Sequence, residues 1–165
     1  MFPFGRDLLA IYVQDHLAAA TLGVELARRA AAENAGTPLG ETLESIKPEI
    51  EADRATLESI MAALEISTDR LKNAVAWAGE KAGRLKLNGR VTSYSPLSPV
   101  VELDGLITGV NGKRALWRAL RCLADEDPRL QAGQLDELIA RADRQLETLW
   151  SAHADASHAA LAADE

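Results

Sequence analysis

Apolar side chains recur every three or four residues along most of this chain, which is the spacing of one face of an α-helix. Stretches rich in Gly, Pro and polar residues interrupt the pattern at 34–40, 87–99 and 125–134. No apolar–polar alternation typical of a strand occurs. The pattern therefore predicts helices over residues 7–34, 42–64, 68–86, 99–124 and 135–161.

The lengths of the connections predict how these helices are arranged. Short connections join the first helix to the second and the fourth to the fifth, so each pair forms an antiparallel hairpin. The long connection between the hairpins, which carries the short helix, is sufficient to run the length of a bundle. Pro48 falls inside the second helical pattern, so we expect a kink there or a segment that restarts at this residue. The prediction is an all-α, single-domain four-helix bundle formed by residues 1–165.

This order of helices resembles the ferritin-like superfamily over nearly the whole chain. The resemblance implies a four-helix bundle with one long crossover, in which carboxylates and two E-x-x-H motifs hold a pair of iron ions. The sequence departs from that pattern at the metal ligands. Its three histidines have Val13, Trp150 and Asp155 where the motif needs Glu, so no E-x-x-H is present. We therefore expect a bundle without the usual di-iron centre.

Composition and charge narrow the range of partners. Hydrophobic residues make up 47% of the chain, and the net charge is -7 with 25 acidic against 18 basic residues. A chain this acidic has no general attraction to nucleic acid or to an anionic membrane. The single cysteine and the lack of a signal peptide or of a long apolar run favour the cytoplasm. Apolar surface on the crossover or on one bundle face predicts a homodimer.

Ionisable residues fall on the apolar faces of all four long helices. A helical-wheel projection at about 100° per residue places six candidates there or at the edge of such a face. Because an unpaired buried charge costs several kcal/mol, we expect these side chains to contact one another. The candidates are His16, Asp53, Glu102, Lys113, Asp143 and His153.

Heights along the bundle, at about 1.5 Å per residue, sort these candidates into two predicted clusters. The first brings together His16, Asp53 and Lys113, with Asp143 reaching the same level from the edge of its face. The second pairs Glu102 with His153, which are nearly equidistant from the turn between the last two helices. A Lys ammonium cannot ligate a metal, because it has no lone pair. Lys113 thus favours a buried polar network over a metal centre.

Three functions remain open from the sequence. The first is a non-catalytic binding or structural module whose polar network fixes helix register and needs no cofactor. The second is a metal-binding protein or oxidoreductase, with iron, manganese or zinc held by His16, Asp53, Glu102 and His153. The third is a protein that binds a small anion through Lys113. Whether the chain is an enzyme is left undecided, since no Gly-rich loop or nucleophile motif accompanies these residues.

Two further patterns concern ligands. Residues 68–90 carry six basic and two acidic side chains, which is typical of a solvated face and also suits a phosphate-bearing partner. The fourth helical segment contains Gly105, Gly109 and Gly112. Glycine is unfavourable inside a helix. These glycines predict either close contact with a neighbouring helix or open space for a ligand beside Lys113.

Overall fold

A computed structural model describes residues 5–68 and 94–162 of the chain. Within these ranges all regular secondary structure is helical, which confirms the all-α prediction. The helix predicted over 68–86 falls on residues outside these ranges, apart from Thr68. None of the helices in the described ranges combines the length and the apolar character needed to cross a membrane. The helices are α1 (Gly5–Glu33), α2 (Pro38–Ala63), α4 (Ser98–Leu123) and α5 (Ala132–Leu161).

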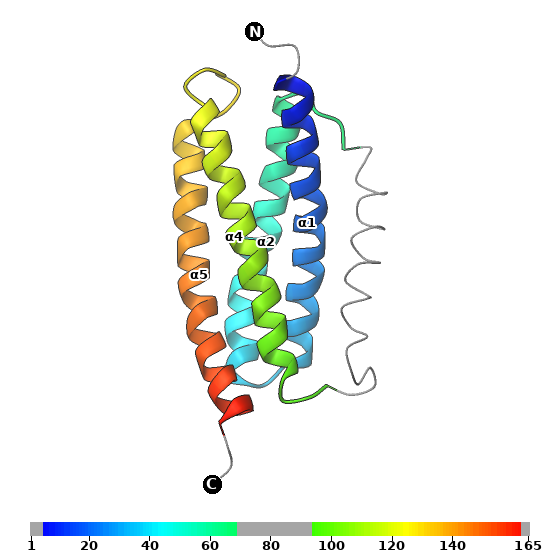
Figure 1. Ribbon diagram of the computed structural model, residues 1–165, viewed down its shortest axis with the longest axis vertical. Helices are drawn as coiled ribbons and strands as arrows, with labels where there is room; N and C mark the ends of the chain where they lie inside the picture. The colour runs from blue at the N-terminus through cyan, green and yellow to red at the C-terminus, as the bar shows by residue number, and fades with distance from the viewer. Residues whose placement is uncertain (1–4, 69–93, 163–165) are drawn as a thin grey trace.

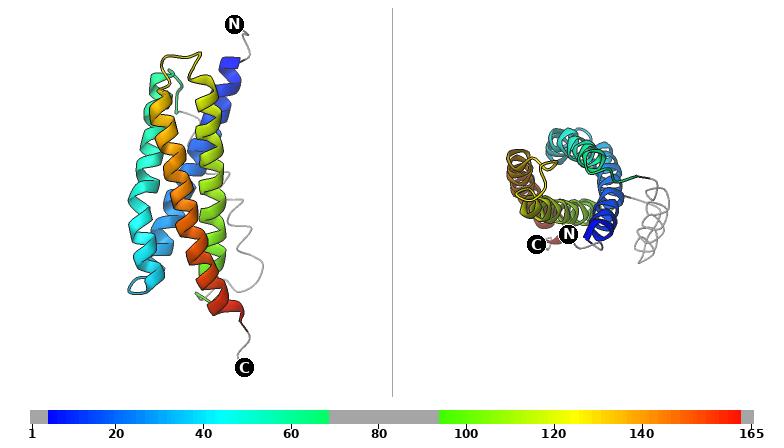
Figure 2. Two further views of the ribbon diagram at one scale, coloured as in Figure 1. Left: turned by 90° about the vertical axis from the view of Figure 1, so that its left-hand side faces the viewer. Right: turned by 90° about the horizontal axis from the view of Figure 1, so that it is seen from above.

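The four helices stand side by side as a bundle (Figure 1). Helices α1 and α2 form one antiparallel hairpin and α4 and α5 form the other, as the short connections predicted. Helices α2 and α4 run in the same direction. Seen from above, the order around the bundle is α1, α2, α5, α4 (Figure 2). Of the four pairs of neighbouring helices, α2 and α5 have the least close contact between their backbones. Long side chains are therefore needed to connect these two helices.

Helix α2 begins four residues earlier than predicted, at Pro38. Pro38 occupies the first turn, where its missing N–H would have had no helical partner. The side chain of Thr37 caps this turn by accepting a hydrogen bond from the Gly40 N–H at 3.1 Å. Of the two alternatives predicted at Pro48, a kink or a restart, the restart is wrong, because α2 is one continuous helix through this residue.

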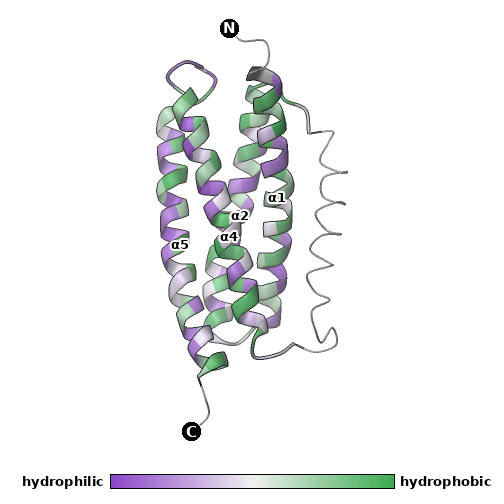
Figure 3. Ribbon diagram, viewed as in Figure 1, coloured by the Kyte–Doolittle hydropathy of each residue, from purple (hydrophilic) through white to green (hydrophobic). Residues whose placement is uncertain are grey.

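The buried apolar side chains form two separate clusters, one in each half of the bundle. Figure 3 shows that hydrophilic and hydrophobic residues both recur along the helices, as expected when each helix has a polar and an apolar face. One cluster contains Val24, Leu43, Leu106 and Leu146, and the other contains Leu17, Leu57, Trp117 and Leu135. Between these levels lie three buried or largely buried polar residues, Asp53, Lys113 and Gln145. The candidate site is this polar layer.

Candidate functional site

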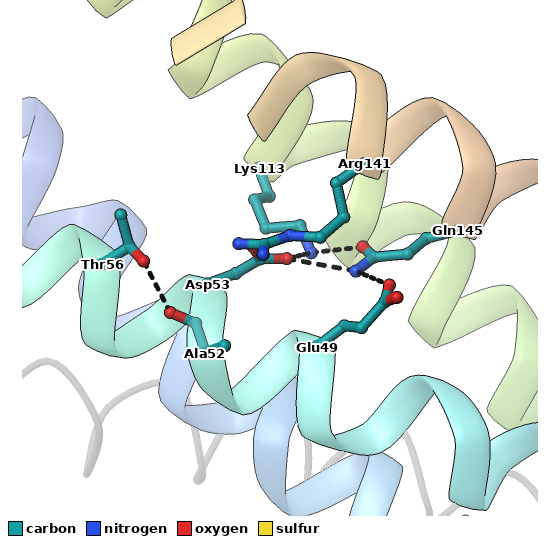
Figure 4. A network of polar contacts seen from close by, with 7 residues as sticks. All are labelled: Glu49, Ala52, Asp53, Thr56, Lys113, Arg141 and Gln145. Carbon is teal, nitrogen blue, oxygen red and sulfur yellow. Dashed lines mark hydrogen bonds and ion pairs between the residues drawn. The ribbon is translucent and has the colours of Figure 1, made fainter. Parts of the chain in front are cut away.

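Asp53 is at the centre of the polar layer. It lies on the apolar face of α2, between Ile50 and Leu57, and is only 2% exposed. Its Oδ2 accepts a hydrogen bond from Lys113 Nζ of α4, and its Oδ1 accepts one from the Arg141 guanidinium of α5 (Figure 4). A single carboxylate thus joins three of the four helices. This supplies the opposite charge that a buried carboxylate requires.

Gln145 of α5 completes the contacts of this layer (Figure 4). Its Nε2 donates to Asp53 Oδ2 at 3.2 Å and to Glu49 Oε2 at 2.9 Å, while its Oε1 accepts from Lys113 Nζ at 2.6 Å. The residue is 2% exposed, so both ends of its amide are satisfied inside the protein. We call Glu49, Asp53, Lys113, Arg141 and Gln145 the polar network. It holds two carboxylates and two cations, so its formal charge is zero.

Burial is the main influence on the ammonium of Lys113. It lowers the pKa of Lys113 below its ordinary value, because the charged form loses contact with water. The charge and hydrogen bond of Asp53 act in the opposite direction, whereas the nearby Arg141 lowers the pKa further. Lys113 therefore depends on Asp53 for its stability inside the bundle.

The structure brings only two members of the first predicted cluster into contact, Asp53 and Lys113. His16 Nδ1 instead donates to the Tyr12 carbonyl oxygen at 2.9 Å. The prediction that Asp143 belongs to this cluster is wrong. This residue pairs with Arg114 at 2.7 Å, and its side chain is 47% exposed. Two positions along a helix correspond to a turn of about 200°, so Asp143 points away from the direction of Gln145.

The second predicted cluster is wrong, because Glu102 and His153 have different partners. Glu102 accepts a hydrogen bond from the Tyr94 hydroxyl at 3.0 Å and forms an ion pair with Arg29 of α1 at 3.5 Å. His153 Nε2 donates to Asp104 Oδ1 at 2.8 Å. Glu102 and Asp104 are two positions apart on α4, so they face opposite directions. The rotation of α4 about its axis brings Asp104 toward α5 and Glu102 toward α1.

Tyr94 and Asn34 extend the contacts of Glu102. Asn34 Nδ2 donates to the Tyr94 hydroxyl oxygen at 2.6 Å, and the same amide donates to the Ala30 carbonyl oxygen at 2.8 Å. Burial, followed by the hydrogen bond to Glu102, raises the pKa of Tyr94 to about 12. These contacts tie the residues before α4 to the end of α1. They are a structural connection separate from the polar network.

The candidate metal ligands do not converge. His16, Asp53, Glu102 and His153 each belong to the separate sets of contacts given above. Among residues 5–68 and 94–162, no group of three or more His, Cys, Asp or Glu side chains is placed to hold a metal ion. The described residues therefore form no preformed set of ligands for a metal cation.

Sequence reasoning missed three members of the polar network, Glu49, Arg141 and Gln145. Gln145 had a usable signal: it follows Ala142 by three positions and precedes Leu149 by four, which places it on the buried face of α5. Gln145 is not ionisable, so the search of apolar faces for charged side chains does not select it. Arg141 lies at the edge of that face and reaches inward with a long side chain that remains 27% exposed.

The glycines of α4 border a cavity of about 220 Å³. Gly105, Gly109 and Gly112 line it together with Lys113 and with small residues of α1. An added Cβ at Gly109 or Gly112 would meet open space, whereas one at Gly105 would lie 2.8 Å from Leu26 Cδ2. Both predicted consequences of these glycines are therefore present, a close helix contact at Gly105 and open space beside Lys113.

No family model, no curated protein and no solved structure matches this chain.

Proposed function

We propose that this chain is a ferritin-like bundle protein that acts as a non-catalytic binding module. In this proposal, the polar network replaces the metal pair as the element that neutralises charge and fixes helix register. The observation that carries it is the Asp53 carboxylate, which receives donors from Lys113 of α4 and from Arg141 and Gln145 of α5. The ammonium thus supplies positive charge in the bundle interior.

The contacts of the network support a structural role over a chemical one. A general acid or base must face its substrate with a group that can give or take a proton. Here both carboxylate oxygens of Asp53 accept hydrogen bonds from cations, and Lys113 donates to both Asp53 and Gln145. Gln145 does not titrate. The two histidine candidates, His16 and His153, bond elsewhere.

The same contacts weigh against the other two functions. A metal site on His16, Asp53, Glu102 and His153 would require these four residues to exchange their present partners. An anion at Lys113 would compete with Asp53, which carries a full negative charge against the ammonium. A network whose formal charge is already zero attracts neither a cation nor an anion strongly.

Metal analysis tests this proposal directly. The chain is produced in medium supplemented with iron, manganese and zinc, purified without chelators, and examined by plasma mass spectrometry beside Asp53→Asn and Asp143→Asn. We expect far less than one metal ion per chain in all three proteins. About one ion per chain, lost in Asp53→Asn and kept in Asp143→Asn, would overturn the proposal in favour of a metal site.

We also propose that the module is a homodimer. Trp150 of α5 is 53% exposed, and Val101 of α4 is 58% exposed. Exposed large apolar side chains are typical of contact surfaces. Light scattering after size-exclusion chromatography tests this, and Trp150→Glu is expected to shift the mass toward a monomer. A monomeric wild-type chain at micromolar concentration would rule it out.

A further inference from the structure

The cavity of about 220 Å³ opens between α1 and α4, halfway along the bundle. Its rim includes six residues with little or no side chain, and Gly109 is exposed there. Because glycine and alanine leave the two helices without bulky groups at this level, the bundle interior is accessible from this side. The small residues of the rim are Ala19, Ala20, Gly23, Gly105, Gly109 and Gly112.

Most of the cavity lining is apolar, and its polar residues are His16, Asp53, Arg54, Thr108 and Lys113. The polar network has already paired the charges of Asp53 and Lys113. Such a combination of apolar walls and few polar groups is typical of sites for small molecules. The apolar wall is made by Ile50, Leu57, Leu106, Val110 and Leu116.

Two residues that line the cavity carry buried donors without an acceptor. The indole N–H of Trp117 and the Nε–H of Arg54 have no hydrogen-bond partner among the described residues. Trp117 is 1% exposed, so its N–H does not reach bulk water. A buried donor without an acceptor is unfavourable, because it has lost its hydrogen bonds to water. A bound molecule with an oxygen acceptor would supply the missing hydrogen bond at Trp117.

The charges around the cavity favour an uncharged ligand. Arg54 donates to Glu58 at 3.0 Å, and Lys113 is paired with Asp53. The two strongly basic side chains in the lining, Arg54 and Lys113, are therefore each paired with a carboxylate, whereas His16 bonds to the Tyr12 carbonyl oxygen. An anion would have to displace one of these carboxylates or lie beside it, whereas a neutral carbonyl or hydroxyl oxygen meets no such repulsion.

We propose that this cavity binds a small, uncharged, mainly apolar molecule with one hydrogen-bond acceptor, which Trp117 Nε1–H contacts. An apolar cavity of about 150 Å³ holds benzene, so about 220 Å³ admits a benzene ring with a short substituent. A cavity of this volume is too small for a peptide or a helix. This inference gives a ligand class to the binding module and therefore rests on the proposed function.

Three molecules of nearly equal shape test the ligand class. Acetophenone has a ring and a carbonyl acceptor, α-methylstyrene replaces that oxygen with CH₂, and benzoate adds a negative charge. Each is titrated into ¹⁵N-labelled protein, and the indole signal of Trp117 is identified by its loss in Trp117→Phe. We expect acetophenone to shift this signal saturably and to bind about tenfold more tightly than α-methylstyrene, the effect of one hydrogen bond. Benzoate is expected to bind more weakly than acetophenone.

Matched variants locate the binding. Gly109→Leu places a side chain in the open space at the rim, and Gly133→Leu makes the same change at an exposed helical position with open space outside the cavity. Gly109→Leu is expected to abolish acetophenone binding and Gly133→Leu to leave it unchanged. Should Gly109→Leu fail to fold, Trp117→Phe followed through backbone amides is expected to bind acetophenone and α-methylstyrene equally.

Several results would overturn the ligand proposal and leave the metal analysis unaffected. These are no saturable shift in folded wild-type protein, equal binding of acetophenone and α-methylstyrene to it, or unchanged binding in Gly109→Leu. Tightest binding by benzoate would make the cavity an anion site instead. Conversion of a dimer to a monomer by Gly109→Leu, without acetophenone binding to the wild type, would assign the rim to contact with a second copy.

Discussion

Lys113 and Asp53 are 60 positions apart in the sequence and form an ion pair in the interior of the bundle. The pair lies between two apolar clusters, at the level where each helix contributes a polar or a small residue in place of a large apolar one. Asp53 is 2% and Lys113 13% exposed at the side chain, so each group lacks the water that would stabilise it alone. The charged form of each group is therefore stabilised by the opposite charge of the other.

Removal of Asp53 should destabilise the protein more than removal of Lys113. Asp53→Leu leaves Lys113 and Arg141 without their shared acceptor, and breaking a buried pair in this way costs about 3–5 kcal/mol. Lys113→Met leaves Asp53 with Arg141 and Gln145 as donors, so we expect a smaller loss of about 2 kcal/mol. Urea unfolding followed by far-UV circular dichroism measures both free energies of unfolding.

The matched control for these variants is Asp143→Ala, which breaks the exposed ion pair with Arg114. A pair of this kind contributes at most about 1 kcal/mol. The double variant Asp53→Leu/Lys113→Met should lose less stability than the sum of the single variants, because the two residues are in contact. Strict additivity would contradict the coupling described above.

Replacement of Pro48 should stabilise α2. Pro48 lies inside the helix and is exposed, so its cost comes from the missing N–H and from its ring rather than from packing. Pro48→Ala is expected to raise the free energy of unfolding by about 1–3 kcal/mol. Pro38→Ala in the first turn of the same helix should change it little, since Pro is favourable there. Equal effects of the two substitutions in urea unfolding would argue against this account.

A methyl group at Gly40 should be poorly tolerated. An added Cβ there would overlap the backbone carbonyl of Asn34, at the turn that joins α1 to α2. Because a backbone group cannot move aside as a flexible side chain can, we expect Gly40→Ala to cost about 1–3 kcal/mol. Gly133→Ala, where open space surrounds the position, should be neutral or stabilising by at most about 1 kcal/mol. Thermal unfolding of the two variants makes the comparison.

Tyr94 should make stability fall at high pH. Its pKa rises from 10.0 to about 12 on folding, so between these values the unfolded chain releases a proton that the folded chain retains. The free energy of unfolding then decreases as the pH rises through this window. Since Tyr94 is 43% exposed, water screens the effect, and we expect a loss below about 1 kcal/mol.

The absorbance of tyrosinate checks this prediction, because the chain has only two tyrosines. The titration curve of the wild type minus that of Tyr94→Phe should have its midpoint at about 12. Glu102→Gln removes the neighbouring negative charge and should move that midpoint down. A midpoint at 10.0 in the difference curve would show that neither burial nor the contact with Glu102 raises the pKa of the hydroxyl.

Much of the fold follows from local pattern. Apolar spacing located four helices within a few residues of their observed bounds, and short connections paired them as antiparallel hairpins. The predicted start of α2 is four residues too late, because proline ends a helix in most positions but is favourable in the first turn. Asp53 and Lys113 were also found from their own helices, since each interrupts an apolar stripe whose period is fixed by helix geometry.

The sequence by itself thus determined which residues form helices, which face of each helix is apolar, and which polar residues interrupt those faces. These are properties of the helix repeat, and each helix expresses them without reference to its neighbours. Only the tertiary structure decided that Asp104 rather than Glu102 contacts His153, that Gln145 rather than Asp143 joins Lys113, and that an opening lies beside Gly109. Partner choice depends on the rotation and stagger of packed helices, where two positions along the chain reverse a side chain's direction.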